Sequence, residues 1–124
     1  MSMKILIVED NLDSREMLHF LLTSHGYDVK TAVDGLEGLY MTKAEKPDLI
    51  ITDLAMPNCD GSEMISVIRA LPEIADIHIV VYTGFDSKLA KSEIAGTANK
   101  TFSKPFDLEA LIEHVNDYNL RTKV

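Results

Sequence analysis

The sequence predicts an α/β protein in which helices cover both faces of a five-stranded parallel sheet. Short β-branched runs alternate with longer stretches of helical spacing, and the cycle recurs about five times along the chain. The runs at 5–8, 49–51 and 79–81 are almost continuously apolar, as strands covered on both faces should be, so we expect them at the sheet centre. The more polar, alternating segments at 27–32 and 100–103 suit positions nearer the edges.

Five helices are expected between and after these strands. The first has an apolar stripe and ends near Gly26, since glycine readily adopts the left-handed conformation that closes helices. That stripe comprises Met17, Leu18, Leu21 and Leu22. The second and third helices begin at the capping boxes formed by Asp34 with Glu37 and by Asp60 with Glu63.

The third helix is predicted to close at Pro72, and a weaker fourth helix to start at Asp86 or Ser87. The last helix has apolar residues at i, i+3, i+4 and i+7, with Asp107 as its expected N-cap. These residues are Leu108, Leu111, Ile112 and Val115. Only a short tail follows Leu120, so residues 1–124 are interpreted as one domain.

Composition favours a soluble protein of a reducing compartment. Hydrophobic residues make up 46% and charged residues 26% of the chain, the balance of a globular protein. Cys59 is the sole cysteine, and the start of the chain shows neither a leader nor a spanning segment, which predicts a cytoplasmic location. The net charge of −8 repels nucleic acid and anionic lipid, so we expect no direct binding to either.

Polar residues follow the predicted strands at the edge where open parallel sheets bind ligands. They are Glu9 and Asp10 after the first strand, Asp53 after the third, Thr83 after the fourth and Lys104 after the fifth. Three carboxylates brought together repel one another unless a cation or protons compensate them, and oxygen-only ligands indicate Mg²⁺. One carboxylate could then attack a phosphoryl group and form an acyl phosphate, with Lys104 adding positive charge and Thr83 a hydroxyl donor.

Taken together, these motifs resemble the receiver domain of two-component response regulators over essentially the whole chain. The matching segments are ILIVEDN at 5–11, PDLIITDLAMP at 47–57, Asp60-Gly61, Tyr82-Thr83-Gly84 and Lys104-Pro105-Phe106. The resemblance implies a flavodoxin-like doubly wound sheet with strand order 2-1-3-4-5. It implies a chain that signals by accepting phosphate and is not a classical enzyme.

The resemblance also implies a role for each site residue. Asp53 would be the phosphoacceptor, and Asp10, Asp53 and the carbonyl of Ala55 would ligate Mg²⁺ directly, with Glu9 acting largely through water. Thr83 and Lys104 would bind the phosphoryl group, and the bond from Lys104 to Pro105 would be cis. The donor would be a histidine kinase or a histidine phosphotransfer protein, and the altered surface would meet a downstream protein target.

The chain departs from the family pattern three residues before the lysine, and the interval of 21 residues from Thr83 to Lys104 is slightly shorter than usual. The aromatic residue that commonly stands three before the lysine is Thr101 here, with Phe102 next to it. In receivers the positions two after the acceptor and two after the threonine flank the hydrolytic water, and here they hold Ala55 and Phe85. Neither side chain can orient water, so slow loss of the phosphoryl group is expected.

Three other functions remain to be separated from this one. A receiver-like interaction module that never takes phosphate would be expected to lose the acidic pair, the acceptor or the lysine, and this chain keeps all of them. A flavin or nucleotide module would need a glycine-rich loop after the first strand, which this sequence lacks. An aspartyl-phosphate hydrolase would need a second acid where this chain has Ala55. The four histidines are scattered without ligand spacing, so they are interpreted as surface or packing residues.

Overall fold

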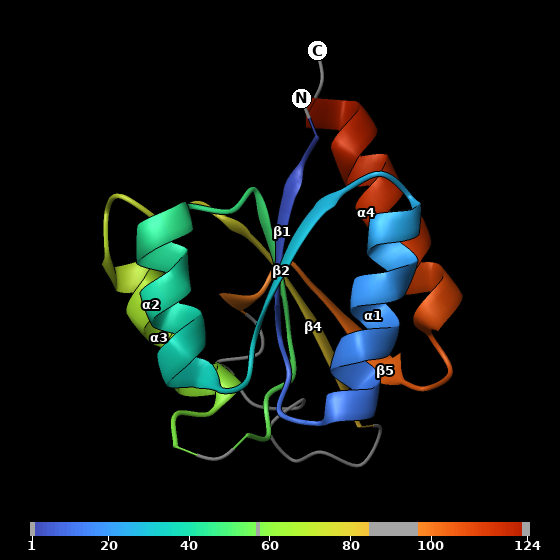
Figure 1. Ribbon diagram of the computed structural model, residues 1–124. Helices are drawn as coiled ribbons and strands as arrows, with labels where there is room; N and C mark the ends of the chain where they lie inside the picture. Colours follow the sequence, from blue (N-terminus) through green and yellow to red (C-terminus); the bar gives the residue numbers. More distant parts are fainter. Residues whose placement is uncertain (1, 57, 85–96, 123–124) are drawn as a thin grey trace.

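The computed structural model describes residues 2–56, 58–84 and 97–122, and in it a central sheet lies between two helical layers (Figure 1). The strands are β1 (Lys4–Val8), β2 (Asp28–Ala32), β3 (Leu49–Thr52), β4 (His78–Gly84) and β5 (Lys100–Lys104). All pairings are parallel and the order is β2-β1-β3-β4-β5, which confirms the predicted flavodoxin-like order. The two more polar strands, β2 and β5, lie at the edges as expected.

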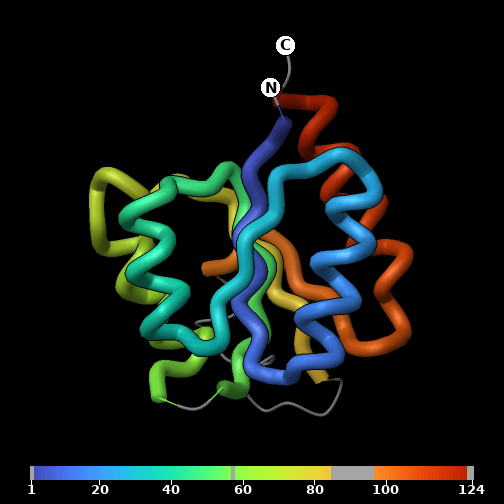
Figure 2. Tube along the Cα trace, viewed as in Figure 1, coloured from blue at the N-terminus to red at the C-terminus, as the bar shows by residue number. Residues whose placement is uncertain are grey.

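The helices form two pairs, one on each face of the sheet. Helices α1 (Leu12–Ser24) and α4 (Leu108–Thr122) cover one face, and α2 (Gly35–Glu45) and α3 (Gly61–Ala70) cover the other, as Figures 1 and 2 show. These are the four helices of the described ranges, and α4 is the last helix of the sequence prediction. The helix predicted to start at Asp86 or Ser87 lies outside the described residues.

Alternate residues of β1 face the two helical layers. Ile5 and Ile7 pack in the core beneath α1 and α4, whereas Leu6 and Val8 pack in the core beneath α2 and α3. Helix α1 contributes Leu18 and Leu22 as fully buried side chains, but Met17 of its predicted stripe is 38% exposed. Because both faces of the central strands are buried, their ends are held at fixed positions along the sheet.

The polar caps predicted for α2 and α3 are confirmed. Asp34 Oδ1 accepts the Glu37 N–H at 2.9 Å, and Asp60 Oδ1 accepts the Glu63 N–H at 2.8 Å. Each such cap contributes about 1 kcal/mol to helix stability. Gly26 follows α1 with a φ of +92°, in the region that side chains disfavour, as the predicted helix end requires.

Asp107 stands directly before α4, but its side chain has a different partner from the one that a simple N-cap implies. Its carbonyl accepts the Leu111 N–H at 2.8 Å, which starts the helix, while its carboxylate accepts the Ser103 N–H of β5 at 2.9 Å. Asp107 therefore ties the start of α4 to the preceding strand. Helix α3 ends at Ala70, just before Pro72, as predicted.

Two histidines, 36 positions apart in the sequence, meet between the sheet and α4. His78 Nε2 and His114 Nε2 lie 2.9 Å apart, and the ring planes differ by 20°, so the pair shares one N–H···N hydrogen bond. Tyr118 stacks on His78 with 4.0 Å between ring centroids. Burial, and then the neighbouring His114, lower the pKa of His78 from 6.5 to about 4, and burial also lowers the pKa of His114.

This pair predicts a loss of stability in mild acid. Because the folded pKa of His78 lies below the unfolded value, its contribution is complete above pH 6.5 and is lost as the pH falls toward about 4. Between about pH 7 and pH 5 we expect the pair to remove about 1 kcal/mol of unfolding free energy, after allowing for its partial exposure. Urea unfolding at both pH values, in wild type and in His78→Gln, measures the difference. An equal pH dependence in the two proteins would refute this assignment.

Candidate functional site

The fold carries the predicted site residues to one edge of the sheet, at the lower end of the strands in Figure 1. Glu9 and Asp10 follow β1, Asp53 follows β3, Thr83 lies in β4 and Lys104 ends β5. The register of β1 and β3 brings Glu9 and Asp53 together. Val8 pairs with Thr52, and these two acidic residues come next in the chain. On the other side of β3, β4 and β5 run in the same direction and end at the same edge.

The Asp53 carboxylate is held through both of its oxygens. Oδ1 accepts the Leu54 N–H at 2.6 Å, the Ala55 N–H at 3.2 Å and the Thr83 hydroxyl at 2.6 Å. Oδ2 accepts a hydrogen bond from the Lys104 ammonium at 2.7 Å. The side chain is 12% exposed, so it is oriented by the protein and still open to solvent. These contacts fix the direction of the carboxylate, and a carboxylate oxygen can act as a nucleophile.

Glu9 and Lys104 form a second, more buried contact beside Asp53. Glu9 Oε1 pairs with the Lys104 ammonium, and Oε2 accepts the Asn11 N–H at 3.3 Å. Burial raises the pKa of Glu9 by more than its Lys104 partner lowers it. Burial by itself would lower the pKa of Lys104, yet the hydrogen bonds from Lys104 to Asp53 and Glu9 raise it. The two directions are compatible because Lys104 faces two carboxylates, whereas Glu9 shares one ammonium with a second anion.

Asp10 and Ala55 lie further out than the other predicted residues. Both are exposed, and no ion pair or hydrogen bond reaches the Asp10 carboxylate within the ranges that the structure covers. In those same ranges no three Asp, Glu, His or Cys side chains converge closely enough to hold a metal. The structure therefore assembles Glu9, Asp53, Thr83 and Lys104, and leaves Asp10 beside this cluster.

The donor chemistry of the cluster fits Mg²⁺. The Lys104 ammonium already touches an oxygen of Glu9 and an oxygen of Asp53, so two carboxylates reach one cation. Asp10 is adjacent in sequence to Glu9 and exposed, and all of the carboxylate donors are oxygens. Mg²⁺ keeps several waters and takes few protein ligands, so two carboxylates with a third beside them suit its chemistry.

The turn after Asp53 depends on close backbone packing at Gly61. The Gly61 N–H donates to the Leu54 carbonyl at 2.8 Å, and a Cβ on Gly61 would lie 2.1 Å from the Asp53 carbonyl oxygen. We expect Gly61→Ala to lower the unfolding free energy by about 1–3 kcal/mol, because backbone must shift to make room. Urea unfolding measures this, with Gly84→Ala as the control, since a Cβ there meets no described residue within 4 Å. Equal losses in both variants would contradict the explanation.

One side chain beside the site was not singled out by the sequence analysis. Arg15, in the first turns of α1, donates from Nη1 to the Glu9 carbonyl at 2.9 Å and to the Asp10 carbonyl at 3.4 Å. A cation early in a helix is usually solvated, so the spacing between Arg15 and the acidic pair does not indicate a contact. Its contact with the acidic turn emerges only from the folded structure.

The departure from the family pattern at Thr101 lies in β5. Thr101 is exposed, whereas Phe102 is 7% exposed and packs against the His114 ring with 5.7 Å between centroids. Phe102 is therefore a core residue and does not replace an aromatic side chain at position 101. The peptide bond from Lys104 to Pro105 is cis, as the resemblance implies. Phe85, which stands two after Thr83 and cannot orient water, lies outside the described residues.

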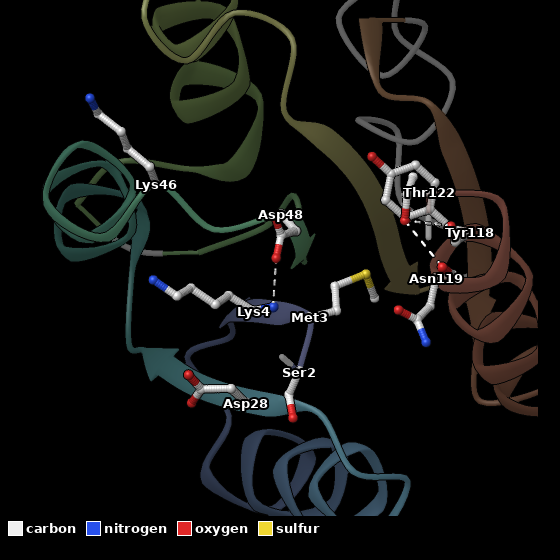
Figure 3. Close-up of a pocket in the computed structure, with 9 residues that line it drawn as sticks. All are labelled: Ser2, Met3, Lys4, Asp28, Lys46, Asp48, Tyr118, Asn119 and Thr122. Atoms are coloured by element: carbon white, nitrogen blue, oxygen red, sulfur yellow. Dashed lines mark hydrogen bonds between the residues drawn. The ribbon is translucent and has the colours of Figure 1, made fainter. Parts of the chain in front are cut away.

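A pocket of about 700 Å³ lies at the opposite edge of the sheet, near the starts of β1 and β2 (Figure 3). There the Lys4 main-chain N–H donates to Asp48 Oδ2 at 2.8 Å. In Figure 3 the side chains of Lys4 and Asp28 both extend to the left, and that of Lys46 extends separately toward the upper left. This pocket lacks the convergent polar groups of the Asp53 site.

Similarity to known proteins agrees with this geometry. The family described as the response regulator receiver domain matches residues 5–116. Response regulator MprA of Mycobacterium ulcerans is 36% identical over 127 residues, which cover 100% of this chain and 53% of that protein. The chain thus spans about half the length of the curated relatives it matches.

None of the helices in the described ranges is both long and apolar enough to cross a membrane.

Solved structures of receivers superpose closely on this chain. Chemotaxis response regulator CheY4 of Vibrio cholerae is 30% identical with a TM-score of 0.84, covering 94% of this chain and 98% of its own. Response regulator TrrA of Thermotoga maritima, solved in complex with Mg²⁺-BeF, is 30% identical with a TM-score of 0.83, covering 93% of this chain and 97% of its own. The order of the strands and the family match over residues 5–116 agree with each other. The chain therefore belongs to the response regulator receiver domain family.

Proposed function

We propose that this chain accepts a phosphoryl group on Asp53 in a Mg²⁺-dependent reaction and thereby changes its surface for a downstream protein partner. The observation that carries the proposal is the Asp53 carboxylate itself, oriented by Thr83 and Lys104 and still open to solvent. The donor would be a histidine kinase or a histidine phosphotransfer protein, in keeping with the receiver family, and the location would be the cytoplasm.

In this proposal a carboxylate oxygen of Asp53 attacks the phosphorus of a phosphohistidine. The new O–P bond forms as the N–P bond breaks, and the donor imidazole leaves with the bonding electron pair. Mg²⁺ would be held by Asp10, Asp53 and the Ala55 carbonyl, with Glu9 acting through water, and would supply positive charge to the phosphoryl oxygens. The similar receiver TrrA was solved in complex with Mg²⁺-BeF, which supports a role for Mg²⁺ in this proposal.

Lys104 and Thr83 would then exchange one partner for another. Lys104 donates to Asp53 Oδ2 and Thr83 to Oδ1, so both donors already surround the attacking group. Once the acyl phosphate forms, its charged phosphoryl oxygens accept hydrogen bonds more strongly than the remaining oxygen of the phosphorylated carboxyl group. Both donors would therefore turn to the phosphoryl group. Thr83 is 2% exposed and lies near the end of β4, so a change in its hydroxyl partner would begin inside the fold and pass along that strand.

Intact mass measurement after incubation with a small phosphodonor tests the proposal. Wild type with Mg²⁺ should gain the mass of one phosphoryl group, and chelator should prevent the gain. Asp53→Asn should gain nothing, because an amide oxygen is too weak a nucleophile. A gain of one phosphoryl group in Asp53→Asn under the same conditions would overturn the assignment.

The alternative function is an interaction module that works without phosphorylation. It predicts no mass gain in wild type, even though Asp53, Lys104 and the acidic pair are present. As a receiver, the chain would be a signalling phosphoacceptor that catalyses its own phosphoryl transfer, and not an enzyme that turns over a separate substrate. The same mass measurement separates the two functions.

The lifetime of the proposed acyl phosphate depends on whether a side chain positions the attacking water. Ala55 is exposed next to Asp53 and its methyl group makes no hydrogen bond, so we expect slow hydrolysis. Ala55→Asn should accelerate the decay of phosphorylated protein by about tenfold to a hundredfold. Decay is followed by intact mass after donor removal, with Asn58→Ala as a control in the same loop. Equal or slower decay in Ala55→Asn would mean that another group positions the water.

A further inference from the structure

The acidic turn between β1 and α1 is held by a side chain that lies outside the predicted site. Arg15 is half-buried, and its Nη1 donates to the Glu9 carbonyl at 2.9 Å and to the Asp10 carbonyl at 3.4 Å. Its own N–H donates to the Asn11 carbonyl at 3.0 Å, so the residue belongs to the helix while its guanidinium reaches back over the turn. One planar group thus binds the main chain of both acidic residues.

We propose that Arg15 is a positioning residue for the metal, because it holds the main chain of Glu9 and Asp10 in place beside Asp53. This inference rests on the proposed function. The Glu9 carboxylate is already fixed, by Asn11 on one oxygen and Lys104 on the other. The Asp10 carboxylate has no such partner within the described part of the chain, so its direction depends on the main chain that Arg15 holds.

Arg15 acts on the metal in two opposite ways. Its positive charge repels a cation at the acidic pair, but across solvent this changes affinity by less than about fivefold. Loss of a group that orients metal ligands typically weakens metal affinity by about tenfold to a hundredfold. Orientation therefore outweighs repulsion, and the two effects have opposite signs. Removing Arg15 should weaken Mg²⁺ binding, whereas removing a positive charge alone should strengthen it slightly.

Calorimetric titration with Mg²⁺ tests this directly, without phosphorylation. Arg15→Met should bind Mg²⁺ at least about tenfold more weakly than wild type. Arg15→Lys, which keeps one charged donor, should fall between the two. Lys43→Met is the matched control, since Lys43 is exposed on α2 and its loss removes the same charge far from the turn.

If Arg15→Met binds Mg²⁺ as tightly as wild type, or more tightly, the inference is overturned. Arg15 would then be a residue that only stabilises the fold. Urea unfolding in chelator separates that role, because a purely stabilising residue lowers the unfolding free energy without changing the metal affinity of the folded protein. Should Arg15→Met fail to fold, Arg15→Lys decides by the same comparison. Wild type that binds no Mg²⁺ would instead overturn the proposed function.

Discussion

Lys104→Met should take up phosphate from a small donor at least about a hundredfold more slowly than wild type. The ammonium lies 2.7 Å from Asp53 Oδ2 and also contacts Glu9, so it stands where negative charge would develop during transfer. Its side chain is 20% exposed, and a charge shielded to this degree stabilises a nearby anion more than a fully solvated one does. The rate of mass gain under saturating Mg²⁺ measures the effect.

The same substitution should have the opposite effect on Mg²⁺ affinity. Without the ammonium, Glu9 and Asp53 are left with uncompensated charge, so the free protein is destabilised and a divalent cation binds more tightly. Lys100→Met is the control, because Lys100 is an exposed cation on the same strand, β5. A Lys104→Met protein that reacts at the wild-type rate would show that Lys104 has no role in transfer.

Asp10→Asn should weaken Mg²⁺ binding by about a hundredfold, because it replaces a charged ligand with a neutral one. Since Asp10 is exposed and its carboxylate has no partner within the described residues, the substitution should leave the unfolding free energy in chelator unchanged. Calorimetric titration measures the affinity, and Asp13→Asn in the first turn of α1 is the control for loss of nearby negative charge. Equal affinity in wild type and Asp10→Asn would remove Asp10 from the ligand set.

The sheet and the place of the site could be predicted because both depend on local patterns. Continuous apolar runs mark the central strands, and the sheet order follows from the family motifs that end them. The residue after each run then lies at a common edge, which is why Glu9 and Asp53 come together. The caps at Asp34 and Asp60 also depend on neighbours three positions away, and both were predicted correctly.

Contacts between distant or flexible side chains could not be predicted in this way. His78 and His114 belong to different elements, and nothing in their spacing indicates a shared hydrogen bond. Arg15 resembles any cation early in a helix until the turn that it contacts is folded. Asp10 is exposed and makes no side-chain contact within the described residues, so its predicted role as a ligand stays a prediction.

Chemical trapping of the phosphorylated residue is the measurement that tests the account most directly. Borohydride reduces an acyl phosphate to an alcohol, so a phosphorylated aspartate becomes homoserine, whose position peptide mass analysis identifies. After incubation with a small phosphodonor and Mg²⁺, homoserine should stand at position 53 and at no other acidic residue. Trapping at Glu9 or Asp10, or no trapped residue in a protein that has gained phosphate, would contradict the assignment of Asp53.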